Sequence, residues 1–335
     1  MSHWKSSCGK LPALLISGSV ATVLCASGLD RGFLWSPIGK DAAVATANVR
    51  SMSAHSEMSS PTTVVAETMM AQQRGGSDRG GFGGGRGGYR APPDRSSYPT
   101  WEKDPRFPDD VFTFARIRYS SASGYGFRGR AWDNDFPDCD WNFSVRLHQL
   151  TSMKVDPNGV VIDMIDPKLL DYPFAYMSNV GNMSLSAGEA EAMRRYLLNG
   201  GFIMADDFWA PGGWENVRRE MEKVFPNRKP RELSRDHEIF HIVYHLKTKP
   251  QVPSIRAWQR GYTFEYWHGD PQGDEEPHFW GYFDDAGRLM ALMCHNNDIG
   301  DGWEREGDNE EYFRDYSVRV SYPLGINIIT YAMTH

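Results

Sequence analysis

The chain has few cysteines, no long apolar run and no excess of positive charge. Its 335 residues include four cysteines and carry a formal net charge of −7, with an isoelectric point near 5.8. A surface without a basic excess disfavours broad nucleic-acid binding. No internal repeat is visible. The composition is typical of a mildly acidic soluble domain.

The N-terminus has the pattern of an export signal. Lys5 and Lys10 precede a small-residue apolar stretch over residues 11–24. Serines and glycines dilute this short stretch, so a membrane anchor through an uncleaved leader is the weaker alternative. We therefore predict an exported protein, periplasmic or extracellular. Cleavage would leave Cys139 and Cys294, which an oxidising compartment permits to pair.

Composition divides the chain into three segments. Residues 1–47 form the predicted export signal and a small-residue spacer, and residues 48–106 a linker rich in glycine and arginine. Such a linker buries too little apolar area to offset its ordering entropy, so we predict that it is disordered. Arg-Gly-Gly runs can also bind RNA, but export favours a plain tether without a nucleic-acid partner. Residues 107–335 form the predicted folded domain.

Strand and helix patterns alternate through this domain. Ser186 and Glu189 form a capping-box pattern, and Gly200 ends the helix that they begin. Asp140 is expected to cap an earlier helix. The expected strands are residues 111–119, 160–162, 174–177, 202–205, 239–246 and 289–294, and two later helices follow near residues 214–224 and 322–333. The alternation predicts an α/β fold with a mostly parallel sheet flanked by helices in three layers.

Seven short motifs mark the chain from about Phe112 onward: Phe114–Tyr119, Tyr172–Phe174, Gly200–Asp207, Phe225–Pro226, His237–Phe240, Asn297–Gly300 and Gly325–Asn327. In these motifs the chain resembles a bacterial family known as domain of unknown function 4159, itself similar to flavodoxin-like and glutamine-amidotransferase-like α/β folds. The family has no established activity, so the resemblance implies a fold and no mechanism. Amidotransferase relatives place a nucleophilic cysteine between glycines. No Gly-x-Cys-x-Gly occurs here, which implies a domain without that thiol nucleophile.

Asp206 and Asp207 are the first candidates for chemistry. They stand directly behind four apolar residues, and ligands of open α/β sheets bind beyond the carboxyl ends of the strands. A carboxylate pair suits a hard cation such as Mg²⁺ or Ca²⁺. It equally suits general acid and base catalysis. The third interpretation is that both acids serve only as turn and cap residues.

Three histidines follow at intervals of four residues. On a helix, His237, His241 and His245 would share one face, as a zinc site requires. The β-formers among residues 239–246 favour a strand instead. In a strand, His241 and His245 are structural, and His237 at the preceding loop is the candidate for catalysis with Asp206 and Asp207.

A second polar cluster follows the strand 289–294, either as a functional site or as a hairpin turn. Arg116 could pair with the acids or clamp an anionic ligand. Aromatic rings in loops beside carboxylates are suited to binding sugars, because a sugar ring stacks on an aromatic face. We expect Asp206, Asp207, His237 and Asp298 to converge on one crevice near Arg116. The candidate ligand-binding residues are Arg116, Tyr119, Trp132, Asn297, Asp298, Trp303 and Glu304.

Three functions remain open, of which the third is a scaffold whose flexible Gly/Arg arm reaches a membrane partner. The first is an exported amidotransferase-like domain that lacks the cysteine nucleophile and binds a polar small molecule, a glycan or an envelope protein at the sheet edge. The alternative is a hydrolase that acts on a glycan or related polar substrate through Asp206, Asp207 and His237, with or without a metal ion. The sequence identifies neither a cofactor nor a metal, and it does not decide whether the protein is an enzyme.

Overall fold

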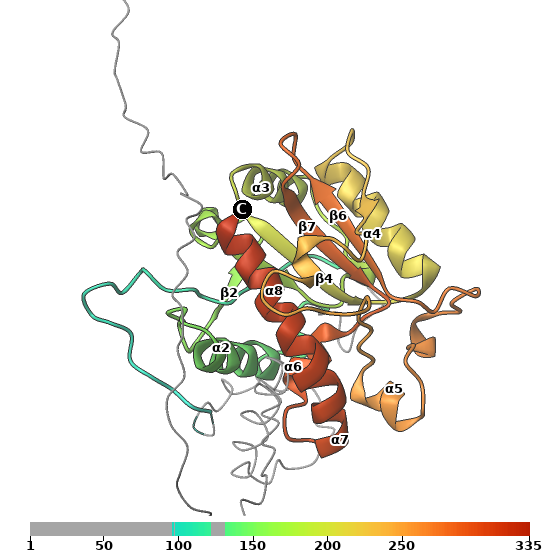
Figure 1. The fold of residues 1–335 in the computed structure, drawn as a ribbon. Coiled ribbons are helices and arrows are strands. Elements are labelled where there is room, and N and C mark those ends of the chain that lie inside the picture. Colours follow the sequence, from blue (N-terminus) through green and yellow to red (C-terminus); the bar gives the residue numbers. More distant parts are fainter. Residues whose placement is uncertain (1–95, 97, 122–130) are drawn as a thin grey trace, which may run out of the picture. The chain divides into compact units, whose positions relative to one another are not determined.

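The computed structural model describes residues 96, 98–121 and 131–335. The predicted leader and almost all of the glycine-rich linker lie outside the described residues. A seven-stranded sheet forms the centre of the domain, in the order β2-β1-β3-β4-β7-β6-β5 (Figure 1). The strands are β1 (Ala115–Arg118), β2 (Val160–Asp163), β3 (Phe174–Met177), β4 (Phe202–Phe208), β5 (Arg231–Glu232), β6 (His278–Phe283) and β7 (Leu289–His295).

The sheet is mostly parallel, as the sequence predicts. The first five strands in the order pair in parallel, and β6 and β5 pair antiparallel at one side. Counted along the chain, the parallel strands have the order 2-1-3-4-5, which is the doubly wound order of flavodoxin. Their carboxyl ends therefore share one edge of the sheet.

Helices cover both faces of the sheet. They are α2 (Asp138–Leu150), α3 (Ala187–Leu198), α4 (Ala210–Val224), α5 (Ile255–Gln259), α6 (Ile299–Glu304), α7 (Glu310–Tyr312) and α8 (Tyr322–Thr334). Short 3₁₀ turns are η2 (Pro167–Asp171), η3 (Val180–Asn182), η4 (Glu238–Phe240) and η5 (Tyr266–His268), and η6 (Phe313–Ser321) is a π-helix that leads into α8.

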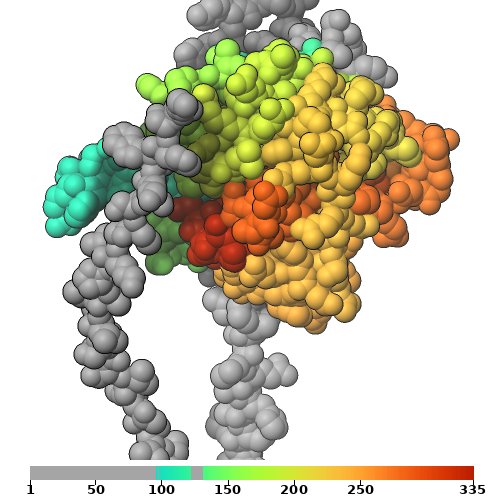
Figure 2. All heavy atoms as spheres, turned by 90° about the horizontal axis from the view of Figure 1, so that it is seen from above, coloured from blue at the N-terminus to red at the C-terminus, as the bar shows by residue number. Residues whose placement is uncertain are grey.

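Alternation along β4 separates two apolar cores. Phe202 and Met204 pack with side chains of α2 and α8, whereas Ile203 and Ala205 pack with side chains of α3 and α4. Both cores are buried, so the three-layer α/β architecture is confirmed. Viewed from above, segments far apart in the sequence, coloured green, gold and red, adjoin on one face (Figure 2).

Contacts with the domain begin before Phe107, the expected start of the folded segment. Tyr98 is buried and its ring meets that of Trp141, while Trp101 donates a hydrogen bond to the carbonyl of Val155. In the part of the chain that the structure describes, no helix is both long and apolar enough to cross a membrane. Cys139 and Cys294 are buried and free, so they do not pair.

Local sequence signals predict α3 well. The Ser186 side chain accepts a hydrogen bond from the Glu189 backbone, and the Glu189 carboxylate accepts one from the Ser186 backbone. After the helix, Gly200 has a φ of +100°. A Cβ on Gly201 would lie 2.4 Å from the Tyr196 ring, so the chain needs glycine at this position for packing.

Two expected elements are wrong. Residues 239–246 form no strand, because the side-chain amide of Asn327 on α8 accepts from Val243 N and Tyr244 N and donates to Tyr244 O. Those backbone groups are therefore not available for a sheet. Asp140 does not cap α2, because the Asp140 carboxylate pairs with Arg116 at 2.5 Å inside the core. The N-cap of α2 is Pro137.

Candidate functional site

Asp206 lies inside β4 and supports the neighbouring elements. It is fully buried, and its Oδ2 accepts hydrogen bonds from Tyr176 Oη at 3.2 Å and from Gly300 N at 2.9 Å. Burial raises the pKa of this carboxyl group to about 8. Asp206 therefore ties the first turn of α6 to the central strand.

Asp207 has a different environment from its neighbour. Its φ is +55°, and the register of β4 against β7 shifts between Ala205 and Phe208, so the regular alternation of the strand is broken here. Asn134 Nδ2 donates to Asp207 Oδ2 at 2.7 Å, and Trp209 Nε1 donates to Oδ1 at 3.2 Å. Burial, with the charge of Glu265, raises the pKa of Asp207 to about 7.

Two further buried acids meet Asp207. One oxygen each from Asp135, Asp207 and Asp298 lies within 4.8 Å of the others. Asp298 is the N-cap of α6, and its Oδ1 accepts from Asp301 N at 2.9 Å. Asp207 and Asp298 therefore lie close together, as expected. The hairpin turn that was the alternative for this segment does not form, because the helix α6 begins after Asp298.

Arg116 positions the loop that carries Asp135. Its guanidinium group is fully buried, bonds both oxygens of Asp140, and donates to the carbonyls of Trp132 and Asn134 at 3.1 and 2.9 Å. The expected ion pair between Arg116 and Asp206, Asp207 or Asp298 does not form. Arg116 instead fixes the backbone from which Asn134 and Asp135 reach the sheet edge.

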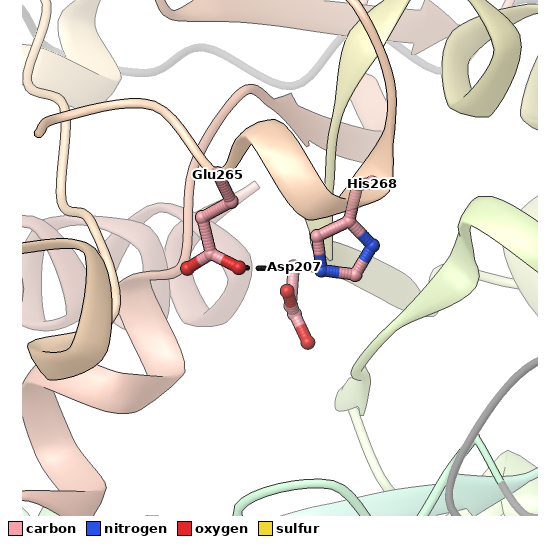
Figure 3. A group of neighbouring side chains, drawn as sticks. All are labelled: Asp207, Glu265 and His268. Atoms are coloured by element: carbon pink, nitrogen blue, oxygen red, sulfur yellow. Dashed lines mark ion pairs between the residues drawn. The ribbon is translucent and has the colours of Figure 1, made fainter.

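Glu265 and His268 complete a second group around Asp207 (Figure 3). One ligand atom from each of these three residues lies within 4.8 Å of the others. The His268 Nε2 atom lies 3.2 Å from Glu265 Oε2, and Glu265 Oε1 accepts from Ser254 N at 2.9 Å. Neither residue is among the candidates that the sequence motifs predict. Their spacing of three, Glu-x-x-His, is the signal that could have indicated a shared face of one helical turn.

A third group of acids is compensated by an arginine. Asp135, Asp301 and Glu304 also lie close together, but Arg305 Nε is 3.2 Å from Asp301 Oδ1 and 2.8 Å from Glu304 Oε2. Asp301 Oδ2 also accepts from Ile255 N at 2.5 Å. The paired arginine makes this group less suited to a cation than the two groups that contain Asp207.

Acidic side chains accumulate at this edge of the sheet. Within the described residues, two cationic groups, Arg305 and His268, form ion pairs with its acids. Two ionised carboxylates 4.8 Å apart repel each other by about 3 kcal/mol at an effective dielectric constant of 20. Burial first, and neighbouring carboxylates second, raise the pKa values of Asp135 and Asp298 well above their usual range. The acids are Asp135, Asp206, Asp207, Glu265, Asp298, Asp301 and Glu304.

His237 does not belong to this site, which corrects the expectation from the sequence. Its ring accepts from Ile239 N and packs beside Phe283 and Tyr331. Tyr331 accepts a hydrogen bond from the backbone of Leu289, the first residue of β7. His237 is therefore at the amino end of that strand, which has seven residues, and about 20 Å from its carboxyl end for six steps of about 3.3 Å.

Other expected binding residues have structural partners. Tyr119 Oη donates to the carbonyls of Ser178 and Asn179, and the Asn297 amide bonds the backbone of residues 250 and 252. Trp303 is buried against Phe143 and Tyr176. These residues shape the surroundings of the acids. Trp132 is half-buried beneath the Arg118 guanidinium group, and Glu304 belongs to the group paired with Arg305.

The chemistry of the two groups around Asp207 differs. Asp207, Glu265 and His268 combine two carboxylates with an imidazole, a donor set that suits Mn²⁺, Fe²⁺ or Zn²⁺. Asp135, Asp207 and Asp298 offer oxygen atoms alone, which suits Mg²⁺, Ca²⁺ or Mn²⁺. Either set would leave coordination positions open for a ligand or for water.

Residues 113–333 match the family described as Domain of unknown function (DUF4159). The chain belongs to this family, as the sequence motifs predict. A search of the curated proteins gave no match.

Proposed function

We propose that this DUF4159 domain binds a divalent cation, and through it a polar ligand, at the carboxyl edge of its sheet. The observation that carries the proposal is the meeting of Asp207, Glu265 and His268 within 4.8 Å. Oxygen and nitrogen donors come from two separate elements, β4 and the η5 turn. Ser254 orients Glu265, and Asn134 orients Asp207, in the way that outer hydrogen bonds fix metal ligands.

The charge balance supports a cation. Glu265 and Asp207 are both buried, and the only cationic partner that either has among the described residues is His268. The pKa of His268 is raised: burial opposes the charged imidazole, but the Glu265 hydrogen bond and the Asp207 charge outweigh it. A divalent cation would replace the proton of His268 and neutralise both carboxylates at once.

Aromatic side chains at the rim favour a sugar or a similar polar ligand. Tyr262, Tyr266 and Trp267 are each exposed by 44 to 49%. The Trp267 ring centroid lies 6.0 Å from that of His268, so this patch adjoins the cation position. A pyranose ring could stack on the aromatic faces while its hydroxyl groups reach the cation.

Calorimetric titration of the EDTA-treated domain with Mn²⁺, Zn²⁺, Mg²⁺ and Ca²⁺ tests the cation. We expect saturable binding of Mn²⁺ and weaker binding by Glu265→Gln. The exposed Glu311, which lies on α7, provides the matched control Glu311→Gln. Absence of binding for all four cations would overturn the proposal. The ligand is tested next, by titrating the Mn²⁺-loaded domain and its Trp267→Ala variant with the hexamers of N-acetylglucosamine and of glucose.

A hydrolase is the second candidate function, and the His268–Glu265 pair favours it. A carboxylate 3.2 Å from an imidazole nitrogen orients that ring, as in many general bases. A cation held by the other group, Asp135, Asp207 and Asp298, would lower the pKa of a coordinated water to about 7 and leave His268 as the base. His268 then takes the role that the sequence analysis gave to His237. Release of new reducing ends from the same hexamers would distinguish hydrolysis from binding.

Export remains part of the proposal. Lys5, Lys10 and the apolar residues after them support a periplasmic or extracellular location, where a glycan or an envelope protein would be accessible. The likeness to amidotransferases stays a prediction, and thiol catalysis is not part of the proposal because Cys139 and Cys294 are buried. Cell fractionation tests the location: intact chain with Met1 retained in the cytosol alone would contradict export.

A further inference from the structure

We propose that the site holds two cations, with the Asp207 carboxylate as the bridge between them. The inference rests on the proposed function, which places the first cation at Asp207, Glu265 and His268. The second position is the group of Asp135, Asp207 and Asp298. Asp207 is the one residue that the two groups share.

Asp207 has the capacity to bridge. Asn134 donates to one of its oxygens and Trp209 to the other, so each oxygen has one hydrogen bond. A carboxylate oxygen has two lone pairs, and one on each oxygen therefore remains for a cation. The left-handed backbone at Asp207 lets this side chain face both groups, which a regular strand would not allow.

Asp135 supplies an independent indication of a ligand at the second position. The residue is 8% exposed, and the single hydrogen bond of its side chain within the described residues is a long one of 3.4 Å, from Ser178 Oγ to Oδ2. The other oxygen, Oδ1, receives no hydrogen bond from these residues although the side chain points into the group. A largely buried carboxylate with one long hydrogen bond is expected where a cation binds.

Gly300 lets the backbone of α6 pack closely against Tyr176 and Asp135 at the second position. Gly300 lies in the first turn of α6, and a Cβ there would come within 3.0 Å of Asp135 Oδ2. Asp298 uses only Oδ1 to cap the same helix, which leaves Oδ2 for the cation. Arg305 does not compete for Asp207 or Asp298, because its ion pairs are with Glu304, Asp301 and Asp308.

Mn²⁺ is the cation that suits both positions. The second position offers oxygen ligands only, and the first adds an imidazole; Mn²⁺ accepts both sets. Two metal ions about 3.5–4 Å apart form the centre of many phosphatases, nucleases and aminopeptidases, where they hold both the attacking and the leaving oxygen. A paired centre at this sheet edge would select ligands with two adjacent oxygen donors, such as vicinal hydroxyl groups or a phosphate.

The experiment counts Mn²⁺ ions and measures whether they interact. We expect two Mn²⁺ per chain by calorimetry and by metal analysis of the full chain, with the electron paramagnetic resonance spectrum of an exchange-coupled pair. Asp298→Asn keeps the oxygen that caps α6, so it should fold while binding one Mn²⁺ with the six-line spectrum of an isolated ion. Asp135→Asn is the second variant with the same expectation. Asp163→Asn, at an exposed pair with Arg118, is the matched control and should bind two.

The outcomes separate this inference from the proposed function. One Mn²⁺ in the wild-type protein, lost in Glu265→Gln and retained in Asp298→Asn, would overturn the second position and leave the first intact. Two Mn²⁺ ions without exchange coupling would overturn the bridging role of Asp207. No Mn²⁺ at all would contradict the proposed function as well.

Discussion

Replacing Asp207 by asparagine should change stability in opposite directions at low and high pH when no metal is present. The substitution keeps the shape of the side chain, and asparagine tolerates the φ of +55° at least as well as aspartate. It removes a negative charge from the centre of the acid cluster. It also turns one of two acceptors into a donor, so either the bond from Asn134 or the bond from Trp209 is lost.

The magnitude follows from the pKa of Asp207. Its ordinary value of 3.8 rises to about 7 in the folded protein, mainly through burial. Below about pH 3 the group is mostly protonated in both states. As pH rises toward 7, the unfolded chain ionises first and the free energy of unfolding falls, by about 4 kcal/mol at 1.36 kcal/mol for each pKa unit. The lost hydrogen bond costs about 1 kcal/mol at any pH.

Urea unfolding with EDTA present measures both contributions to stability, from the ionisation of Asp207 and from the lost hydrogen bond. We expect Asp207→Asn to be about 3 kcal/mol more stable than the wild type at pH 8 and about 1 kcal/mol less stable at pH 3. In excess Mn²⁺ the wild type should gain about 3 kcal/mol at a concentration 100 times the dissociation constant, and the variant should gain little. Asp163→Asn, in an exposed ion pair, should change stability by less than about 1 kcal/mol throughout.

A loss of about 1 kcal/mol at both pH values would refute this reasoning. That result is expected if Asp207 only orders its loop and has no electrostatic strain to relieve. The pH 8 measurement therefore distinguishes a functional acid from a turn residue before any ligand is known.

Two further predictions concern the framework of the site. Arg116→Met should lower the free energy of unfolding in urea by about 3–5 kcal/mol, because Asp140 is left buried without its partner. An added Asp140→Leu should restore much of this stability, and a cost of Arg116→Met below about 1 kcal/mol would contradict the pairing. Gly201→Ala should cost about 1–3 kcal/mol, because its Cβ would lie 2.4 Å from the Tyr196 ring. Gly188→Ala, in α3, is the matched control and should not destabilise, because a Cβ there meets nothing within 4 Å; equal costs would refute the packing argument.

The elements that the sequence predicts well are those with local signals. The capping box at Ser186 and the glycines after α3 are local signals. The short apolar run of β4, between two glycines and two acids, is typical of a parallel strand buried on both faces. The segment 239–246 has the same β-forming composition and no strand. Its backbone is bonded by Asn327, more than 80 residues away in the chain, and no local pattern reveals such a partner.

The same distinction applies to the acids of the site. Asp207 and Asp298 follow parallel strands, whose carboxyl ends must share an edge, so their meeting is predictable from order alone. Asp135, Glu265 and His268 come from loops, and their placement depends on contacts such as Arg116 with Asn134 and Ser254 with Glu265. His237 failed as a candidate because its strand does not exist, which removes the geometric reason for placing it near the acids.

The left-handed residue in β4 explains why two adjacent acids have separate tasks. In a regular strand, side chains at positions 206 and 207 would face opposite layers, and one would point away from the crevice. The shift in register at Asp207 instead leaves Asp206 with Tyr176 and the start of α6, while Asp207 meets the loop residues. A non-glycine residue with positive φ is strained, and strain of this kind persists where the surrounding structure over-determines it. Asn134 and Trp209 hold the Asp207 side chain in that position, so removing both donors should relax the bulge and separate Asp207 from Asp298 and Glu265.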